Sequence, residues 1–222
     1  MLPRILETEV MDSPEEARDY DAMDHSAVNR VFVADFLALW NEKVPLLDVG
    51  TGTALIPIEL CRHAPTARLV AIDMAKEMLH VGEVNVARAH LEDQIQLQEA
   101  DAKHMPFGDA TFAAVISNTI VHHIPDPLAV LAEMVRVVRP GGLLFVRDLL
   151  RPPRKEKLEQ LVNLYAAGAI AHQRQMFADS LHAALTLDEI RNLVAKLGFQ
   201  PDTIQQTSDR HWTWSARKRN EE

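Results

Sequence analysis

Three aspartates, each at the end of a short apolar run, could together bind a nucleotide: Asp48, Asp73 and Asp101. A carboxylate such as Asp73 can accept hydrogen bonds from both hydroxyls of a ribose, and Asp101 can accept one from the exocyclic amine of adenine. Each aspartate could equally cap a helix. Because the carboxyl ends of neighbouring parallel strands meet at one edge of a sheet, the three positions predict one ligand-binding crevice.

Small residues follow Asp48, where Gly50, Thr51 and Gly52 join an apolar run to a helical segment. Such a turn lets the backbone approach a ligand without Cβ collisions, although a glycine turn can also be purely structural. The dinucleotide fingerprint needs glycine or alanine at the sixth position counted from Gly50, and this chain has Leu55 there. The Gly-Lys-Ser/Thr sequence of a nucleotide triphosphatase loop is absent as well. The turn therefore predicts a nucleotide-like ligand other than NAD, FAD or a triphosphate.

Two adjacent histidines, His122 and His123, are the best candidates for a general base. They lie in the segment 117–124, which begins with Ser117, and a neutral imidazole can accept a proton near pH 7. Packing against a cofactor, or capping a backbone carbonyl, would explain the pair as well. No metal is expected, because adjacent residues rarely present both rings to one ion and no spaced ligand set accompanies them.

Charged side chains farther along the chain could contact a second ligand. Asp148 could orient or deprotonate an acceptor, and Arg147 or Arg151 could hold an acidic one, although an ordinary surface ion pair is an equal explanation. His172 lies in a later segment, where a solvated helix face is the favoured explanation.

Short apolar runs separated by helical segments predict a parallel sheet that is covered on both faces, as in a doubly wound α/β fold. The Arg-Pro-Gly-Gly sequence at 139–142 is predicted to turn the chain before the fifth strand. The predicted strands span residues 45–49, 68–72, 95–99, 112–117, 142–147, 203–207 and 210–215.

Capping signals place several helices. Ser13 with Glu16, and Thr186 with Glu189, have the spacing of capping boxes, and Asp126 caps a helix ahead of residue 139. Residues 155–184 contain no proline and one glycine, which predicts a helical insertion after the fifth strand. A helix from Ser26 is predicted to bury an apolar stripe formed by Val28, Val31, Phe32, Phe36, Leu37 and Trp40.

These elements divide the chain into an N-terminal helical arm at 1–43 and a domain at 44–222. With 222 residues the chain fits one main core. Its 23 basic and 32 acidic residues give a net charge of −9, which disfavours nonspecific binding to nucleic acid. Cys61 is the one cysteine, and no signal peptide or membrane-length apolar run is found. A cytoplasmic protein is expected.

Several ordered motifs between residues 44 and 146 resemble the class I S-adenosylmethionine-dependent methyltransferases. They are the Asp48–Ala54 turn, the aspartates that follow, Pro-Phe-Gly-Asp-Ala-Thr-Phe at 106–112 and Arg-Pro-Gly-Gly at 139–142. The chain is most similar to the small-molecule type found in quinone-biosynthesis C-methyltransferases. Ala54 occupies the place where the family often has a third glycine.

The resemblance implies a Rossmann-like sheet of seven strands, the last of them antiparallel. It implies S-adenosylmethionine as the cofactor, with Asp73 at the ribose and an N-terminal arm that can close over the ligand. It also implies that the segment after the fourth strand faces both cofactor and acceptor, and that the inserted helices form the acceptor wall. The residues expected at the cofactor are Tyr20, Asp48, Gly50, Thr51, Gly52, Asp73, Met74, Asp101, Ala102, Ser117 and His122, and those expected at the acceptor are His123, Arg147, Arg151 and His172.

The expected reaction is an in-line transfer of a methyl group to a small-molecule acceptor, with His122, His123 and Asp148 as the catalytic candidates. The sequence does not choose among oxygen, nitrogen, carbon and sulfur acceptors. Neither nucleic acid nor membrane is an expected partner, and the oligomeric state is open, a homodimer included. Three alternatives stay open: a noncatalytic protein that binds the cofactor or a partner, an RNA methyltransferase and, last, a nicotinamide oxidoreductase.

Overall fold

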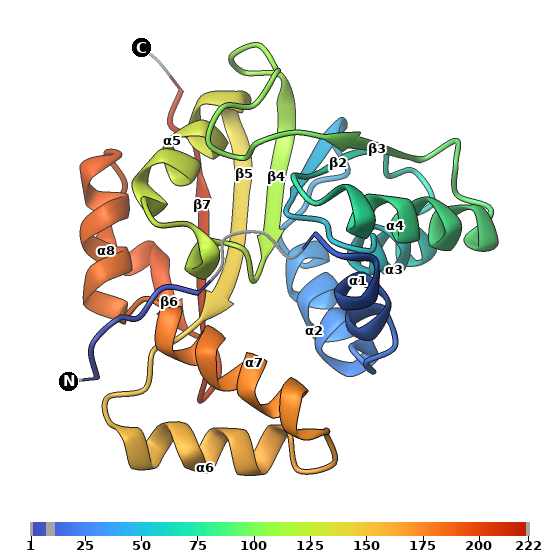
Figure 1. Cartoon of the computed structure of the whole chain (residues 1–222). Helices are drawn as coiled ribbons and strands as arrows, with labels where there is room; N and C mark the ends of the chain where they lie inside the picture. Colours follow the sequence, from blue (N-terminus) through green and yellow to red (C-terminus); the bar gives the residue numbers. More distant parts are fainter. Residues whose placement is uncertain (1, 8–11, 221–222) are drawn as a thin grey trace. The chain divides into compact units, whose positions relative to one another are not determined.

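A computed structural model describes residues 2–7 and 12–220 of the chain. Within them the strands form one seven-stranded sheet with the hydrogen-bonded order β3-β2-β1-β4-β5-β7-β6 (Figure 1). β1 pairs in parallel with β2 and β4, β2 pairs in parallel with β3, and β7 runs antiparallel to β6. The predicted Rossmann-like α/β fold, with its antiparallel last strand, is confirmed. No helix among the described residues is long and apolar enough to cross a membrane.

Six of the seven predicted strands are found within two residues of their expected ends, and the fifth is longer. The strands are β1 Leu46–Val49, β2 Leu69–Asp73, β3 Ile95–Glu99, β4 Phe112–Asn118, β5 Val138–Leu149, β6 Ile204–Gln206 and β7 His211–Arg217.

The turn predicted at 139–142 is wrong, because β5 starts at Val138 and runs through these residues. Gly142 lies too close to neighbouring atoms to carry a side chain, and Gly141 has a positive φ. A Cβ on Gly142 would lie 2.7 Å from Val138 Cγ2 and 2.9 Å from the carbonyl oxygen of Ala113 on β4. Gly141 has a φ of +72°, and its N–H donates to the carbonyl of Lys218 at 2.8 Å. Glycine inside a strand often marks such a close approach of two backbones.

Eight α-helices and two 3₁₀ turns lie in the described residues, and the predicted caps are confirmed. Ser13 with Glu16 and Thr186 with Glu189 form capping boxes, and the Leu128 N–H donates to Asp126 at 3.1 Å. The elements are α1 Pro14–Asp21, α2 Ser26–Leu37, α3 Leu55–His63, α4 Lys76–Ala89, η1 Val121–His123, α5 Pro127–Val137, α6 Lys155–Tyr165, α7 Ala171–Ala183, α8 Leu187–Lys196 and η2 Pro201–Thr203.

The helical insertion predicted at 155–184 is confirmed and consists of two helices, since α6 ends at Tyr165 and α7 starts at Ala171, with Gly168 between them. Arg174 on α7 donates to the carbonyl of Ala166 at 2.7 Å and so satisfies the end of α6. The prediction for α2 needs correction. On α2, Val28 and Val31 are exposed, and the buried face is instead formed by Asn29, Phe32, Val33 and Phe36.

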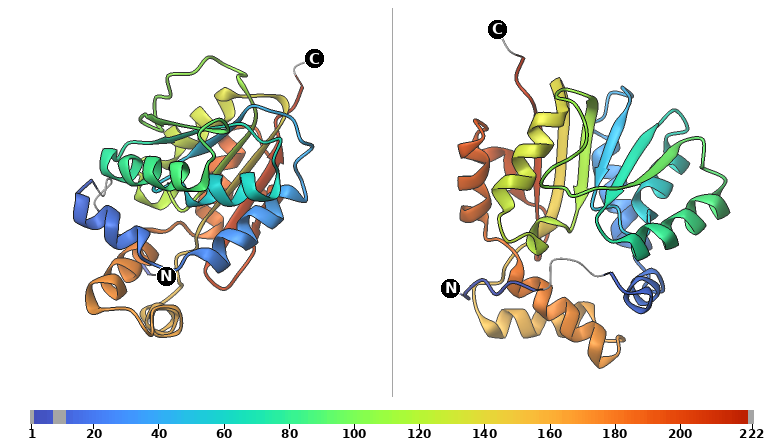
Figure 2. Two further views of the ribbon diagram at one scale, coloured as in Figure 1. Left: turned by 90° about the vertical axis from the view of Figure 1, so that its right-hand side faces the viewer. Right: turned by 45° about the horizontal axis from the view of Figure 1, so that its top comes forward.

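The described residues form two compact units. Unit 1 contains residues 2–7, 119–128 and 147–214, and unit 2 contains residues 12–118, 129–146 and 215–220. The division at residue 43 expected from the sequence stays a prediction. In unit 1, α6 and α7 lie side by side as a helical hairpin (Figures 1 and 2) and bury Leu158, Leu161 and Leu181.

The main apolar cluster of unit 2 joins α2 and α3 to the strands. Phe32 and Phe36 of α2 contact Phe145 of β5, with ring centroids 5.1 and 5.8 Å apart. Cys61 of α3 belongs to the same cluster and is 3% exposed. Burial raises the pKa of the Cys61 thiol to about 11.

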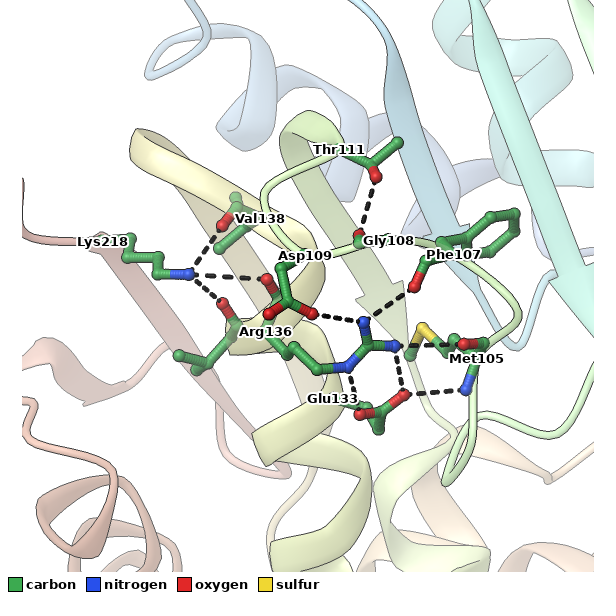
Figure 3. A network of polar contacts seen from close by, with 10 residues as sticks. Met105, Phe107, Gly108, Asp109, Thr111, Glu133, Arg136, Val138 and Lys218 are labelled. Carbon is green, nitrogen blue, oxygen red and sulfur yellow. Dashed lines mark hydrogen bonds and ion pairs between the residues drawn. The ribbon is translucent and has the colours of Figure 1, made fainter.

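A polar network in unit 2 fixes the segment before β4 (Figure 3). Arg136 of α5 donates to Glu133 at 2.6 Å, to Asp109 at 2.8 Å and to the carbonyl of Phe107 at 2.7 Å. The ammonium group of Lys218 donates to the carbonyls of Val135 at 2.8 Å and Val138 at 3.0 Å, where α5 ends. A cation at that end satisfies free carbonyls and complements the helix dipole. The Pro-Phe-Gly-Asp segment is thus held by side chains as well as by its own turn.

Candidate functional site

The glycine turn after β1 is fixed by the end of β2. The N–H groups of Gly50 and Thr51 both donate to the carbonyl of Ile72 at 2.9 Å, and the Gly52 N–H donates to Asp73 Oδ2 at 2.8 Å. Gly50 and Gly52 have φ values of +75° and +54°, a region that glycine adopts without strain. Ala54 also adopts a positive φ, +63°, so its position has the backbone conformation that a third glycine would favour.

Asp73 performs the capping role and remains available for a ligand. Its Oδ1 accepts from the Ala75 N–H at 2.9 Å, at the start of α4, while Oδ2 accepts from Gly52. Burial raises the pKa of Asp73, and these backbone donors oppose the shift. Since each carboxylate oxygen has two acceptor sites, one site on each oxygen is left for hydroxyl donors.

Asp48 is a buried carboxylate with an unused oxygen. Its residue is 2% exposed, and Oδ2 makes no hydrogen bond within the described part of the chain. Burial raises the pKa of Asp48 to about 7 against an opposing hydrogen bond from Thr51, and the charge of Asp73 adds to the increase. A buried acceptor without a donor is costly, so the position suits a cationic or hydrogen-donating ligand group.

Tyr20 of α1 lies beside the glycine turn. Its Cε1 atom is 3.7 Å from the place where a Cβ on Gly52 would be, and its ring stacks on His25 at 4.6 Å. Burial raises the pKa of Tyr20 to about 12, and the charges of Asp73 and Asp48 add to the effect. The structure thus brings Tyr20 together with the turn and the first two aspartates.

The other cofactor candidates of unit 2 differ in exposure. Asp101 follows β3, accepts from the Lys103 N–H at 2.8 Å and pairs with the Lys103 ammonium group at 3.1 Å. Ala102 is buried and Met74 is 41% exposed. Ser117 of β4 is completely buried, and its hydroxyl donates to the carbonyl of Val49 at 2.8 Å, so it links β4 to β1.

In unit 1, His122 and Asp148 form a buried pair. Asp148 Oδ1 lies 2.6 Å from His122 Nδ1, and Asp148 Oδ2 accepts from the His122 backbone N–H at 3.1 Å. The side chains are 3% and 1% exposed. Burial alone would lower the pKa of His122, but the charge and hydrogen bond of Asp148 outweigh it and raise that pKa. Burial would likewise raise the pKa of Asp148, and His122 reverses that shift.

Glu7, from the N-terminal segment, contacts both histidines. Its Oε1 lies 3.3 Å from His122 Nε2 and 3.1 Å from His123 Nδ1, and the two imidazole rings are 4.1 Å apart. Arg4 of the same segment donates to the carbonyls of His122 at 3.1 Å and Ile124 at 3.0 Å. We call Glu7, His122, His123 and Asp148 the histidine cluster.

The remaining candidates for acceptor binding are not gathered around one point. Arg147 is buried and donates to Thr213 at 2.9 Å. Arg151 is also buried, donating to the carbonyl of Ala184 at 3.1 Å and pairing with Glu189 at 2.5 Å. The arginine side of this ion pair is therefore buried, whereas Glu189 is partly exposed. His172 is exposed near the start of α7.

Three residues near these sites have no place in the sequence interpretation. Asn85 of α4 donates to Asp21 at 2.7 Å and to the carbonyl of Thr53 at 3.1 Å, fixing α1 and the glycine turn. Gly82 lets α4 approach the turn, and an isolated glycine within a helical pattern is a signal that could have indicated it. Glu7 carries no such signal, because it stands far from the histidines in the sequence.

Comparison with known proteins points to one chemistry. Residues 47–146 match the family described as "Methyltransferase domain". The demethylmenaquinone methyltransferase of Porphyromonas gingivalis is 27% identical over 86% of this chain and 92% of its own length. The ubiquinone/menaquinone biosynthesis C-methyltransferase UbiE of Geobacter sulfurreducens is 26% identical over 72% of this chain, and the match spans 66% of that relative.

The fold has close counterparts among solved structures. A SAM dependent methyltransferase from Aquifex aeolicus superposes with a TM-score of 0.68 over 93% of this chain and 98% of its own, at 17% identity. At that identity the likeness supports the fold, and the matched domain and the sequence relatives supply the chemistry.

Proposed function

Because the chain is a class I S-adenosylmethionine-dependent methyltransferase similar to the quinone-biosynthesis C-methyltransferases, we propose that unit 2 holds the cofactor and that the histidine cluster of unit 1 acts on a small-molecule acceptor. The observation that carries the first half is the buried Asp48 oxygen without a donor, next to a glycine turn fixed by Asp73. A buried acceptor without a donor suits a ligand that carries a cationic or donating group.

The residues of unit 2 fit the parts of S-adenosylmethionine one by one. Asp48 supplies a buried anionic oxygen for the ammonium group of the methionine moiety, beside Gly50, Thr51 and Gly52. Asp73 has free acceptor sites for the two ribose hydroxyls. Asp101 and Ala102 provide a partly exposed carboxylate and an apolar surface for the adenine, and Tyr20, Met74 and Ser117 complete the proposed cofactor set.

The cofactor, when bound, supplies a sulfonium-activated methyl group for in-line displacement. The chain's own task is then to align the acceptor and exclude water. We assign two tasks to His122 and His123. They hold the acceptor, and where the attacking atom of the acceptor carries a proton, they accept that proton. Asp148 fixes the orientation of His122 through two hydrogen bonds. Arg147, Arg151 and His172 remain weaker proposals for acceptor binding.

The acceptor class follows from the relatives' names. Demethylmenaquinone and the precursors implied by ubiquinone/menaquinone biosynthesis are oxygen-bearing ring compounds, so a reduced, hydroxylated aromatic ring is the proposed acceptor. The cytoplasm is the proposed compartment, supported by a single, buried and unpaired cysteine. The net charge of −9 supports a small molecule over RNA.

Calorimetric titration with S-adenosylhomocysteine tests the cofactor site. We expect Asp73→Ala to weaken binding more than tenfold, because the ribose hydroxyls lose their acceptor. Asp93→Ala is the matched control, since Asp93 is an exposed aspartate ahead of β3 and should leave the affinity within twofold. Circular dichroism confirms that each variant is folded. Unchanged affinity in a folded Asp73→Ala variant would remove the ribose assignment.

Transfer of a labelled methyl group to a panel of hydroxylated aromatic compounds tests whether the chain methylates the proposed class of acceptor. Formation of labelled product together with S-adenosylhomocysteine supports the proposed acceptor class. A chain that binds S-adenosylhomocysteine tightly and methylates nothing in a panel of oxygen, nitrogen, carbon and sulfur acceptors would instead favour a noncatalytic binding protein.

A further inference from the structure

Three side chains from two distant segments converge on one point in unit 1. Glu7, His122 and His123 each offer one possible ligand atom, and these three atoms lie within 4.8 Å of one another. The side chains are 17%, 3% and 20% exposed, so water reaches them only in part. The N-terminal segment that carries Glu7 runs beside the end of α7 (Figure 1), where the Ile5 N–H donates to the carbonyl of His182 at 3.2 Å.

The separations suit ligands of a metal ion. Metal bonds to imidazole nitrogen and carboxylate oxygen are about 2.0–2.2 Å long, which puts two ligand atoms of a tetrahedral site about 3.3–3.6 Å apart. Glu7 Oε1 lies 3.3 Å from His122 Nε2 and 3.1 Å from His123 Nδ1. Two edges of the triangle therefore have nearly the length that a bound ion requires.

The geometry at Glu7 Oε1 differs from that of a simple ion pair with His122. Although Oε1 is buried and close to His122 Nε2, it makes no hydrogen bond within the described residues. A protonated His122 bonded to Glu7 would need its N–H to point at that oxygen. The second oxygen, Oε2, accepts from the Ser180 hydroxyl at 3.3 Å, which helps to hold the carboxylate in this orientation.

The surroundings of His122 are those of a metal ligand. Asp148 Oδ1 lies 2.6 Å from His122 Nδ1 and favours a proton on that nitrogen, so the neutral ring carries its lone pair on Nε2, which is 3.3 Å from Glu7 Oε1. Metal-binding histidines commonly donate their other ring N–H to a carboxylate in this way. Arg4 fixes the backbone on either side through the carbonyls of His122 and Ile124.

Charge balance favours the same conclusion. With His122 and His123 neutral, Glu7 and Asp148 bring two negative charges into a mostly buried cluster, and burying charges without a partner is costly. The guanidinium group of Arg4 interacts electrostatically with Asp148 and balances part of this charge. A divalent cation among the three ligand atoms would balance the remainder.

We propose that Glu7, His122 and His123 bind one divalent first-row transition-metal ion, with Asp148 as the positioning residue behind His122. Two imidazoles and one carboxylate form a ligand set that suits zinc, iron or cobalt. The sequence argued against a metal because adjacent histidines rarely present both rings to one ion and because no spaced ligand accompanies them. In the structure both rings have a nitrogen close to Glu7, and Glu7 supplies the spaced ligand. Three protein ligands leave room for a fourth, and this last step rests on the proposed function: an acceptor oxygen could bind there and have its pKa lowered. In the metal-bound chain the two imidazoles would then hold the ion instead of accepting the acceptor's proton.

Titration of the untagged, chelator-treated chain with Zn²⁺ and with Co²⁺ tests the site. We expect one ion per chain by calorimetry, and with Co²⁺ the visible absorption of a tetrahedral nitrogen and oxygen environment. Glu7→Gln and His123→Asn should each weaken Zn²⁺ binding at least tenfold, and Asp148→Asn by about 10–100-fold. Glu156→Gln and His80→Asn, which change exposed residues of α6 and α4, should leave it within twofold.

Two results would overturn the proposal. One is the absence of stoichiometric Zn²⁺ and Co²⁺ binding by the folded chain, and the other is equal Zn²⁺ affinity in the wild type and Glu7→Gln. If Glu7→Gln does not fold, His123→Asn gives the same decision. Titration of these variants with S-adenosylhomocysteine separates the two proposals, because a lost metal site should leave cofactor affinity unchanged, whereas failure of the cofactor assignment appears at Asp73.

Discussion

Asp48 shows how a single side chain can oppose folding and still serve a ligand. Its carboxyl group is buried, one of its oxygens has no hydrogen-bond donor, and its pKa is raised to about 7. The unfolded chain releases this proton near the ordinary pKa of 3.8, so the folded state binds more protons between about pH 4 and pH 7. The contribution of Asp48 to stability is therefore lost as the pH rises through that window.

We expect Asp48→Asn to remove this pH dependence, because asparagine cannot ionise. Relative to the wild type, the variant should be more stable at pH 8 than at pH 5, by about 2–3 kcal/mol. Urea unfolding of both proteins at the two pH values measures the difference. If the stability difference between the proteins is the same at pH 5 and pH 8, Asp48 is ionised in the folded chain throughout and its burial has been overestimated.

The sequence predicted which residues of the proposed cofactor site lie together, but it did not predict which residue contacts the histidines. The aspartates and the glycine turn were found because short apolar runs place them at strand ends, and the structure brings Asp48, Asp73 and Tyr20 together. Glu7 was missed because nothing local marks it, and its contact with His122 depends on the tertiary path of the N-terminal segment. A lone glutamate in a sequence carries no information about such a contact.

At the scale of elements, the helix caps and strand ends were predicted well. The role of the glycines at 141–142 and the exposed face of α2 were not. The capping boxes at Ser13 and Thr186 are local and formed as expected. The glycines at 141–142 predict a turn, but they lie inside β5. Glycine is typical both of loops and of strands that pack closely against a neighbour, so the sequence does not distinguish the two. The face of α2 was misjudged at Val28 and Val31 because spacing alone does not say which apolar residues meet the sheet.

Gly142→Ala should destabilise the chain by about 1–3 kcal/mol, since the added methyl group would overlap the β4 backbone at Ala113. Gly168→Ala, in the loop between α6 and α7, is the matched control. A Cβ there has no neighbour within 4 Å, so its effect should stay within about 0.5 kcal/mol. Urea unfolding measures both. Equal stability of the two variants would show that β4 and β5 can separate enough to accept a side chain.

At the scale of the whole molecule, the proposed cofactor residues and the histidine cluster belong to different compact units. Tyr20, Asp48, Asp73, Asp101 and Ser117 are part of unit 2, whereas the cluster is part of unit 1. The fold class and the parallel strands were predictable from the order of apolar runs along the chain, and the antiparallel last strand was predictable from the family resemblance. The grouping into units was not, since it depends on which segments pack together.

Ligand binding should raise the stability of the folded chain by mass action. S-adenosylhomocysteine at 100 times its Kd is expected to add about 2.7 kcal/mol to the free energy of unfolding. For a chain of this size the melting temperature should rise by about 5–10 °C. Thermal unfolding with and without the ligand measures the shift. NAD⁺ is the control, because Leu55 breaks its fingerprint, and an equal shift with NAD⁺ would contradict the assigned ligand.

Cys61 has a practical consequence for chemical labelling. Its sulfur is covered by the packing of α3, and at neutral pH it keeps the proton that a nucleophilic thiolate must lose. Maleimide and iodoacetamide reagents should therefore not modify Cys61 in the folded chain. A cysteine introduced at an exposed position such as Gly168 would be the one reactive thiol, so a fluorescent or spin probe can be attached there without first mutating the protein's own sulfhydryl.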